Sequence, residues 1–249
     1  MKVIVIAAGS GKRLGKNMEN IPKYLLDING KTILEHQLAI FEKFNFEEII
    51  VITGPHREKF TIRRGFTFVE DVNYQKHDIL GSLMEARKHI KGDVLIIYSD
   101  IIFDALILRQ IIESDVDIGI AVDLDWEKSY KYRTEHPKTE AENVLLDKNH
   151  NLLEIRKNIT HKNKIIGEFL GILKLSKKGS ELFVKRFEQL EKSHIGSFHM
   201  ASSLEKAYLT DMLQELVDSK IKIMPIIISG KWCEIDTIQD LERAVKLFP

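Results

Sequence analysis

The sequence has one cysteine, Cys233, and no surplus of either charge, and each of these absences excludes a class of protein. A single cysteine excludes a framework of intrachain disulfides, so we expect a reducing, cytoplasmic compartment. The 37 basic and 37 acidic residues cancel, which argues against a general affinity for nucleic acid or for acidic membranes. The first apolar run is short and is interrupted at residues 9–13, so the sequence predicts neither a signal peptide nor a membrane span.

The sequence does have length and apolar content. Its 249 residues are 44% hydrophobic, which is enough to bury a large core. It contains no internal repeat, low-complexity tract or linker, so we predict a single domain over residues 1–249.

The stretch MKVIVIAAGSGKRLG at residues 1–15 predicts a strand followed by a ligand-binding loop. Residues 3–7 form the continuous apolar run that is typical of a strand buried on both faces of a parallel sheet. Residues 8–11 have almost no side chains, so a phosphate or the edge of a base can approach bare backbone N–H groups. Lys12 and Arg13 add positive charge beside this loop. The loop matches neither GxGxxG nor GxxxxGK[ST], and an ordinary turn with two surface cations is the alternative interpretation.

The rest of the chain alternates between predicted strands and helices. This pattern indicates an α/β fold with a mixed, mainly parallel central sheet flanked by helices. Thr32 and Glu35 have the spacing of a capping box for a helix that runs to about Phe44. We expect further strands at residues 48–53, 66–70, 94–98, 117–123, 152–156, 167–175 and 226–228, and further helices at residues 82–89, 180–191, 202–218 and 238–247. Ligands of such folds bind at the carboxyl ends of the parallel strands.

Three acidic residues follow predicted strands in positions that suit a metal ion. Asp100 comes directly after the strand at residues 94–98. Glu234 and Asp236 are two positions apart, so in extended backbone they project to one face and repel each other unless a cation compensates. Because Mg²⁺ prefers carboxylate, phosphate and water oxygens, we predict a magnesium site at these three residues. Asp100 alone is also compatible with a loop-capping role, and Asp104 is expected to be structural.

The opening motif resembles that of a known family. A-A-G-S-G-x-R-L, followed by Pro22-Lys23, is similar to the start of the nucleotidyltransferases that join a nucleoside monophosphate to a sugar phosphate or a similar acceptor. The resemblance implies a Rossmann-like nucleotidyltransferase fold in which Arg13 and Lys23 are catalytic and hold the triphosphate. It supports the predicted metal site. It also implies nucleotide binding by Ala7, Ala8, Gly9, Ser10 and Gly11.

A second landmark of this family is an N-x-x-S-L-x-x-A segment that contributes to base recognition. Here Gly81 and Ser82 match the pattern, but Asp78 stands where asparagine is common. A carboxylate cannot donate hydrogen bonds as an amide does, so this departure leaves the identity of the base open. In the alternative interpretation, Gly81 and Ser82 are simply the N-cap of a helix.

The segment at residues 126–144 carries information about the acceptor. Composition alone is compatible with a solvated, partly helical loop. Its string Y-x-x-R-x-x-H-P-x-x-E-A-E resembles a landmark of cytidylyltransferases found with phosphonate biosynthesis, which are relatives of the phosphocholine cytidylyltransferases; these relatives share a G-E-F-x-G segment at residues 167–171. An amino acceptor suits carboxylates and aromatic faces, and its phosphonate or phosphate suits Arg or Lys. The resemblance implies acceptor binding by Tyr130, Arg133, His136, Glu140, Glu168 and Trp232.

Three functions are compatible with these patterns. The first is a Mg²⁺-dependent cytidylyltransferase that transfers CMP from CTP to a small phosphonate or phosphorylated amino alcohol. The second keeps the fold and uses UTP or GTP with a sugar phosphate. The third is a non-catalytic nucleotide-binding regulatory module. For the first, an acceptor oxygen attacks the α-phosphorus in line, and positioning and charge neutralisation drive the reaction without a dedicated base. The sequence predicts no nucleic-acid or membrane partner and leaves a homodimer open.

Overall fold

The computed structural model describes residues 1–9, 21–54, 59–60 and 65–249. The predicted site residues Ser10, Gly11 and Arg13 lie outside these ranges. The described strands are β1 (Lys2–Ala7), β2 (Asp27–Ile28), β3 (Lys31–Thr32), β4 (Glu48–Thr53), β5 (Phe66–Glu70), β6 (Val94–Tyr98), β7 (Ile101–Phe103), β8 (Ile118–Asp123), β9 (Glu142–Leu146), β10 (Leu152–Lys157), β11 (Ile165–Leu175), β12 (Met224–Ile227) and β13 (Trp232–Glu234). The described α-helices are α1 (Ile33–Phe41), α2 (Ile79–Glu85), α3 (Ala105–Glu113), α4 (Lys177–Ser193), α5 (Leu209–Asp218) and α6 (Ile238–Leu247).

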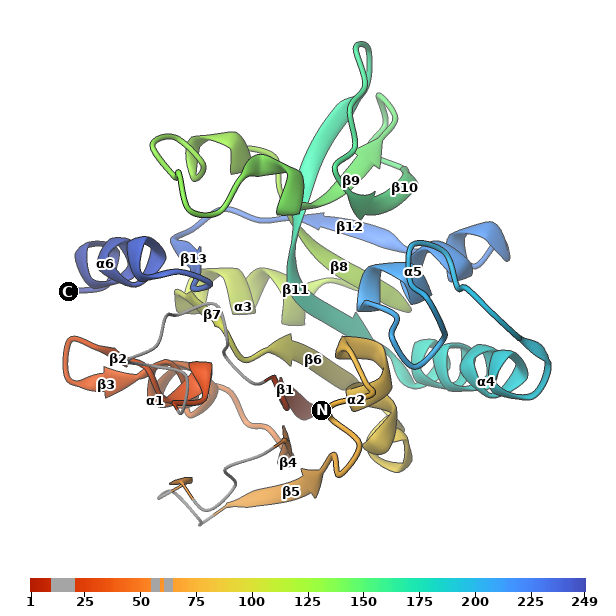
Figure 1. The fold of residues 1–249 in the computed structure, drawn as a ribbon, viewed down its shortest axis with the longest axis horizontal. Coiled ribbons are helices and arrows are strands. Elements are labelled where there is room, and N and C mark those ends of the chain that lie inside the picture. The colour runs from red at the N-terminus through yellow and green to blue at the C-terminus, as the bar shows by residue number, and fades with distance from the viewer. Residues whose placement is uncertain (10–20, 55–58, 61–64) are drawn as a thin grey trace.

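A mixed sheet in the order β10-β9-β11-β6-β1-β4-β5 forms the centre of the molecule (Figure 1), and β8 and β12 branch from β11. β6, β1, β4 and β5 run parallel to one another, whereas β11 is antiparallel to β6, β8 and β9. Helices flank this sheet, so the predicted α/β fold class is confirmed. The apolar run at residues 3–5 is fully buried, because β1 lies between β4 and β6 and is covered on both faces.

Besides the central sheet, the fold has two small two-stranded sheets, one of β13 and β7 and one of β2 and β3. β13 pairs with β7 in antiparallel register, which places Glu234 opposite Ile101 and next to Asp100. The hairpin of β2 and β3 leads into α1, where Thr32 and Glu35 form the predicted capping box. In Figure 1, α6 and β13 lie on the same side of the sheet as α1, β2 and β3. Segments more than 200 residues apart in the sequence, such as Asn29 and Val245, are therefore in contact.

Some predicted boundaries were wrong. The helix expected at 202–218 begins only at Leu209, because the preceding segment turns and offers its carbonyls to another helix: Glu205 and Ala207 accept hydrogen bonds from the backbone N–H groups of Asp78 and Leu80. The helix expected at 82–89 is α2, which starts at Ile79. Gly81 and Ser82 are therefore buried inside this helix, and the N-cap interpretation of them is wrong.

The helix α3 was not predicted, and Asp104 explains its start. The Asp104 carboxylate accepts hydrogen bonds from the backbone N–H groups of Leu106 and Ile107, which makes it the N-cap. It also accepts from the backbone N–H of Lys231 at 2.9 Å, so the expected structural role is confirmed. Within the described ranges, no helix is long and apolar enough to cross a membrane.

Candidate active site

A cavity of about 200 Å³ opens at the carboxyl ends of β1 and β6, where the switch-point rule places ligands. Its lining includes six of the predicted residues: Ala8, Gly9, Lys23, Asp78, Ser82 and Asp100. It also includes four residues that were not predicted: Tyr74, His77, Tyr98 and Ser99. We call this cavity the nucleotide pocket. Ala7 is buried at the end of β1 directly before it.

Small residues shape the edge of the nucleotide pocket. Gly54 follows β4, and a Cβ atom at this position would lie 2.3 Å from the carbonyl oxygen of Ala8. Glycine is therefore required for the chain after β4 to pass the loop after β1.

Lys23 lies at the boundary of the nucleotide pocket, in the short 3₁₀ turn that follows Pro22. Its Nζ donates to Asp100 Oδ2 at 2.8 Å and also to Asp236 Oδ1. Burial alone would lower the pKa of Lys23, but the two carboxylates more than offset burial and raise this pKa above its ordinary value. The ammonium group therefore stays charged and neutralises the pair.

Glu234 and Asp236 meet a histidine from the segment between β8 and β9. His136 Nδ1 lies 3.0 Å from Asp236 Oδ2, and His136 Nε2 lies 3.8 Å from Glu234 Oε2. Burial, followed by the charges of Asp236 and Asp100, raises the pKa of Glu234 to about 7. Among the described residues, His136 Nε2 is buried without a hydrogen-bond partner, so this nitrogen is free to contact a further polar group.

These carboxylates have the chemistry of a magnesium site. Asp100 and Asp236 already share one cation, the Lys23 ammonium, and their charges contribute, after burial, to the raised pKa of Glu234. Oxygen donors of this kind, converging at the edge of a phosphate-sized pocket, fit Mg²⁺. A His136, Glu234 and Asp236 cluster with donor atoms within 4.8 Å of one another lies at the same place. The predicted set of three carboxylates is thus brought together, and its occupancy by Mg²⁺ stays a prediction.

Arg133 is enclosed by acidic partners. Its Nε donates to Asp240 at 2.5 Å, one terminal nitrogen lies 3.4 Å from Glu234, and its guanidinium group lies 4.8 Å from the ring centre of Tyr130. Asp240 also completes the capping box of α6 with Thr237. Arg133 therefore connects the predicted acceptor segment to the helix that follows the predicted metal ligands, and its contact with an acceptor stays a prediction.

Tyr130 and Glu168 form a buried pair beside this arginine. The Tyr130 hydroxyl donates to Glu168 Oε1 at 2.6 Å, whereas Glu168 Oε2 is buried and has no hydrogen-bond partner among the described residues. Burial, followed by the charge of Glu234, raises the pKa of Glu168 well above its ordinary value. A buried carboxyl group with an unused oxygen can bind a polar group of a ligand, as an acceptor when ionised and as a donor when protonated. We call Tyr130, Arg133, His136, Glu168 and Glu234 the acceptor cluster.

The two other predicted acceptor residues lie outside this cluster. The Glu140 side chain is partly exposed and pairs with Lys157 at 3.1 Å. Trp232 is buried and donates from Nε1 to Asp123 at 2.9 Å. Asp123 is the cross-strand neighbour of Glu168 in the pairing of β8 with β11, so Trp232 is linked to the cluster through one intervening residue.

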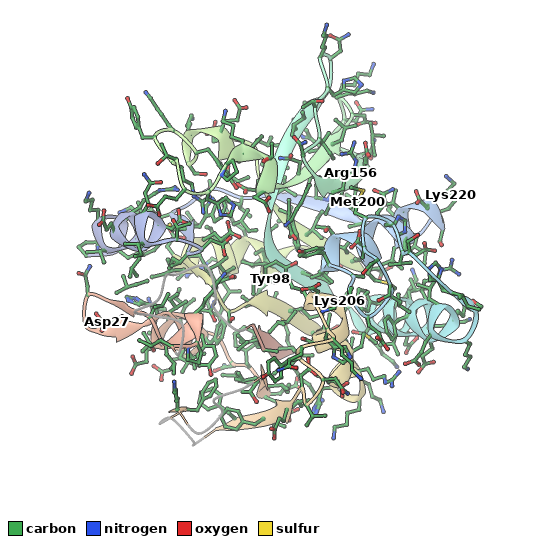
Figure 2. All side chains as sticks on the ribbon, in the orientation of Figure 1. Asp27, Tyr98, Arg156, Met200, Lys206 and Lys220 are labelled. Atoms are coloured by element: carbon green, nitrogen blue, oxygen red, sulfur yellow. The ribbon has the colours of Figure 1, made fainter. Side chains whose placement is uncertain are left out.

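Tyr98 lines the nucleotide pocket and was not predicted as a site residue; Figure 2 shows it near the centre of the molecule. Its hydroxyl donates to Glu142 at 3.2 Å, and burial raises the pKa of Glu142 to about 8. Gly171 has a φ of +74°, and a Cβ atom there would lie 2.2 Å from the Tyr98 ring. The last glycine of the G-E-F-x-G segment is thus needed to make room for Tyr98, a signal that the sequence contains but that only the fold explains.

The fold and the site together are those of a nucleotidyltransferase. Small residues follow a parallel strand at its carboxyl end, and a lysine lies beside carboxylates from two neighbouring segments. The model of the MobA-like NTP transferase domain matches residues 3–136, more than half of the 249 residues. The chain therefore belongs to this family, and the predicted resemblance to nucleotidyltransferases is confirmed.

Individual relatives cover the whole chain. CTP:phosphoglutamine cytidylyltransferase of Campylobacter jejuni is 24% identical over 99% of this chain and 100% of its own length. The bifunctional protein GlmU of Methanococcus vannielii is 30% identical over 100% of this chain, which spans 55% of that longer protein. Among solved structures, the CTP:phosphocholine cytidylyltransferase of Streptococcus pneumoniae has a TM-score of 0.72 at 18% identity, covering 100% of this chain and 99% of that one. This last likeness shows the shared fold.

Proposed function

We propose that the protein is a Mg²⁺-dependent cytidylyltransferase that transfers CMP from CTP to a small phosphorylated or phosphonate acceptor and releases pyrophosphate. The observation that carries the proposal is the Lys23 ammonium between Asp100 and Asp236 at the edge of the nucleotide pocket. A charge-neutralising group in that place suits a triphosphate and its metal ion. The choice of CTP is supported by the cytidylyltransferase of Campylobacter jejuni, which aligns along its whole length.

The proposal gives each charged group a task. Asp100, Glu234 and Asp236 hold Mg²⁺, which when bound neutralises charge on the phosphates. Lys23 exchanges part of its contact with the two aspartates for the triphosphate, together with Arg13. The acceptor oxygen is already ionised near neutral pH, so it attacks the α-phosphorus and displaces pyrophosphate without a general base. Catalysis then comes from alignment and from fixed positive charge.

The acceptor cluster suits a donor-bearing acceptor. Glu168 offers an unused buried oxygen, and the Tyr130 hydroxyl fixes the other oxygen of the same carboxyl group. An amino, ammonium or hydroxyl group beside the reacting phosphate would satisfy that oxygen. We therefore favour phosphonates and phosphates of amino or hydroxy compounds over a plain sugar phosphate.

A matrix of nucleotides and acceptors tests the proposal. CTP, UTP and GTP are each combined with 2-aminoethylphosphonate, 2-hydroxyethylphosphonate, phosphocholine, phosphoglutamine, inositol 1-phosphate and glucose 1-phosphate, and pyrophosphate release is followed with Mg²⁺ or with EDTA. We expect CTP with one of the first four acceptors to give the highest kcat/KM, and only with Mg²⁺. UTP with glucose 1-phosphate as the best pair would contradict it.

One observation favours a second candidate, a sugar-phosphate nucleotidyltransferase using UTP or GTP. GlmU of Methanococcus vannielii is 30% identical to this chain, and Asp78, which lines the pocket at a position where asparagine is common in the family pattern, leaves the identity of the base open. The same matrix separates the two candidates, because each predicts a different best pair of nucleotide and acceptor.

A further inference from the structure

A buried carboxylate stands behind the nucleotide pocket without lining it. Asp71 follows β5, and its side chain is fully buried. Its Oδ1 accepts from the backbone N–H of Asn73 at 2.9 Å and lies 3.0 Å from His77 Nδ1, and its Oδ2 accepts from Ser82 Oγ at 2.7 Å. A carboxylate accepts hydrogen bonds and does not donate, so both side-chain partners must donate to it.

This arrangement decides what Ser82 can offer to a ligand. A hydroxyl group has one hydrogen, and Ser82 gives it to Asp71, so only its lone pairs remain for the nucleotide pocket that it lines. His77 lines the same pocket. In the tautomer that directs Nδ1–H to Asp71, Nε2 is the acceptor nitrogen of the ring.

Asp78 gives this wall a third acceptor. Its side chain makes no capping hydrogen bond to α2, and as a carboxylate it also only accepts. An asparagine could turn either its oxygen or its nitrogen to a base, whereas Asp78 cannot. The departure of Asp78 from the family pattern thus agrees with the polarity of Ser82 and His77.

We infer that Asp71 fixes Ser82 and His77 as acceptors and so makes the pocket select a pyrimidine with an exocyclic amino group over one with a carbonyl group. The amino group of cytosine donates hydrogen bonds to such a wall. Uracil presents an oxygen at the same position, which would leave two acceptors facing each other. Asp71 is a positioning residue in this account, because it acts through Ser82 and His77. The inference rests on the proposed use of CTP.

The substitution Asp71→Asn tests it by reversing one hydrogen bond. If the amide oxygen keeps the Asn73 and His77 contacts, its NH₂ group donates to Ser82 Oγ and releases the hydroxyl hydrogen toward the pocket. One reversed hydrogen bond changes relative binding by about tenfold or more. We expect the ratio of kcat/KM for CTP to that for UTP to fall by that factor, with UTP use rising in absolute terms.

A merely structural role for Asp71 would lower both rates together and leave the ratio unchanged. That result, obtained with a variant that binds CTP and melts cooperatively, overturns the inference. Preference of the wild-type enzyme for UTP would contradict the proposed function instead, before any variant is made. The two failures are therefore distinguishable.

Two further variants keep the test decisive if Asp71→Asn does not fold. Ser82→Ala removes the acceptor itself, so CTP use should fall by about tenfold while UTP use falls less. An unchanged ratio in that variant also overturns the inference. Glu85→Gln is the matched control: Glu85 lies 3.9 Å from His77 on the side away from the nucleotide pocket, so neutralising it should leave the ratio as in wild type.

Discussion

The nucleotide pocket and the acceptor cluster lie next to each other but are built in different ways. The pocket uses backbone and small residues at the ends of neighbouring parallel strands, such as Ala8 and Gly9. The cluster uses long charged side chains from segments up to about 100 residues apart, such as Arg133 and Glu234. The pocket is therefore encoded by local geometry, whereas the cluster depends on charge pairing between distant segments.

Lys23, Asp100 and Asp236 form the contact between the two regions. Asp236 pairs with Lys23 on the pocket side and with His136 on the cluster side. If the reaction takes place at this contact, substitutions there should abolish turnover, and substitutions farther into either region should change the use of only one substrate. The following predictions use that difference, from the largest effect to the smallest.

Asp236→Ala should abolish pyrophosphate release, by about 10²-fold or more, because it removes a metal ligand and a partner of Lys23 at once. Steady-state assays of pyrophosphate release measure the loss. Asp104→Ala is the matched control. It removes the N-cap of α3 and should cost about 1 kcal/mol of unfolding free energy while turnover is retained. Wild-type turnover in EDTA, or full activity of Asp236→Ala, would remove the assigned metal role.

Lys23→Ala should weaken the use of CTP by about 10²-fold and change the binding of CMP much less, because only the triphosphate needs the ammonium group. Competition binding with CMP and CTP measures both. Equal losses for the two nucleotides would instead assign Lys23 a structural role in holding Asp100 and Asp236 together.

Tyr130→Phe should raise the KM for the acceptor by about tenfold and leave the KM for CTP unchanged, since it removes the hydroxyl that orients Glu168. Glu127→Gln serves as the control, because Glu127 is exposed and pairs only with Lys138 among its described salt bridges. If the KM for CTP rose with that for the acceptor, the two regions would not be separable.

Much of the nucleotide side was predictable from sequence, because its signals are local. The apolar run of β1, the small residues after it and the Thr32 and Glu35 capping box each act within a few positions. The pairing of Asp71 with Ser82 was not predictable, since no local pattern states that the end of β5 meets the inside of α2.

Four members of the acceptor cluster, Tyr130, Arg133, His136 and Glu168, were predicted only through the family resemblance, whereas Glu234 was predicted as a metal ligand. The geometry of the cluster depends on the register of β13 with β7 and of β11 with β9, which composition does not specify. For this reason Arg133 was expected to face an acceptor but is enclosed by Asp240 and Glu234. Likewise, the partner of Glu168 could be identified as Tyr130 only in the folded chain.

The smallest expected effect concerns stability. Burial raises the pKa of Glu142 to about 8; the charge of Lys157 and the hydrogen bond from Tyr98 lower it, and the charges of Glu234 and Asp100 raise it. Since the folded state binds this proton more tightly than the unfolded state, stability is lost as pH rises from about 4.5 to 8. Glu142→Gln should reduce that loss by ~1 kcal/mol or more. Urea unfolding in EDTA at several pH values measures it, and parallel curves for both proteins would contradict the assignment.

The most direct test of the central claim is the identity of the product. ³¹P NMR of the protein with CTP, Mg²⁺ and each acceptor should show pyrophosphate and a CMP-linked acceptor appearing together in equal amounts. A non-catalytic regulatory module would bind CTP and leave its three phosphorus resonances unconverted with every acceptor, and that result would contradict the account.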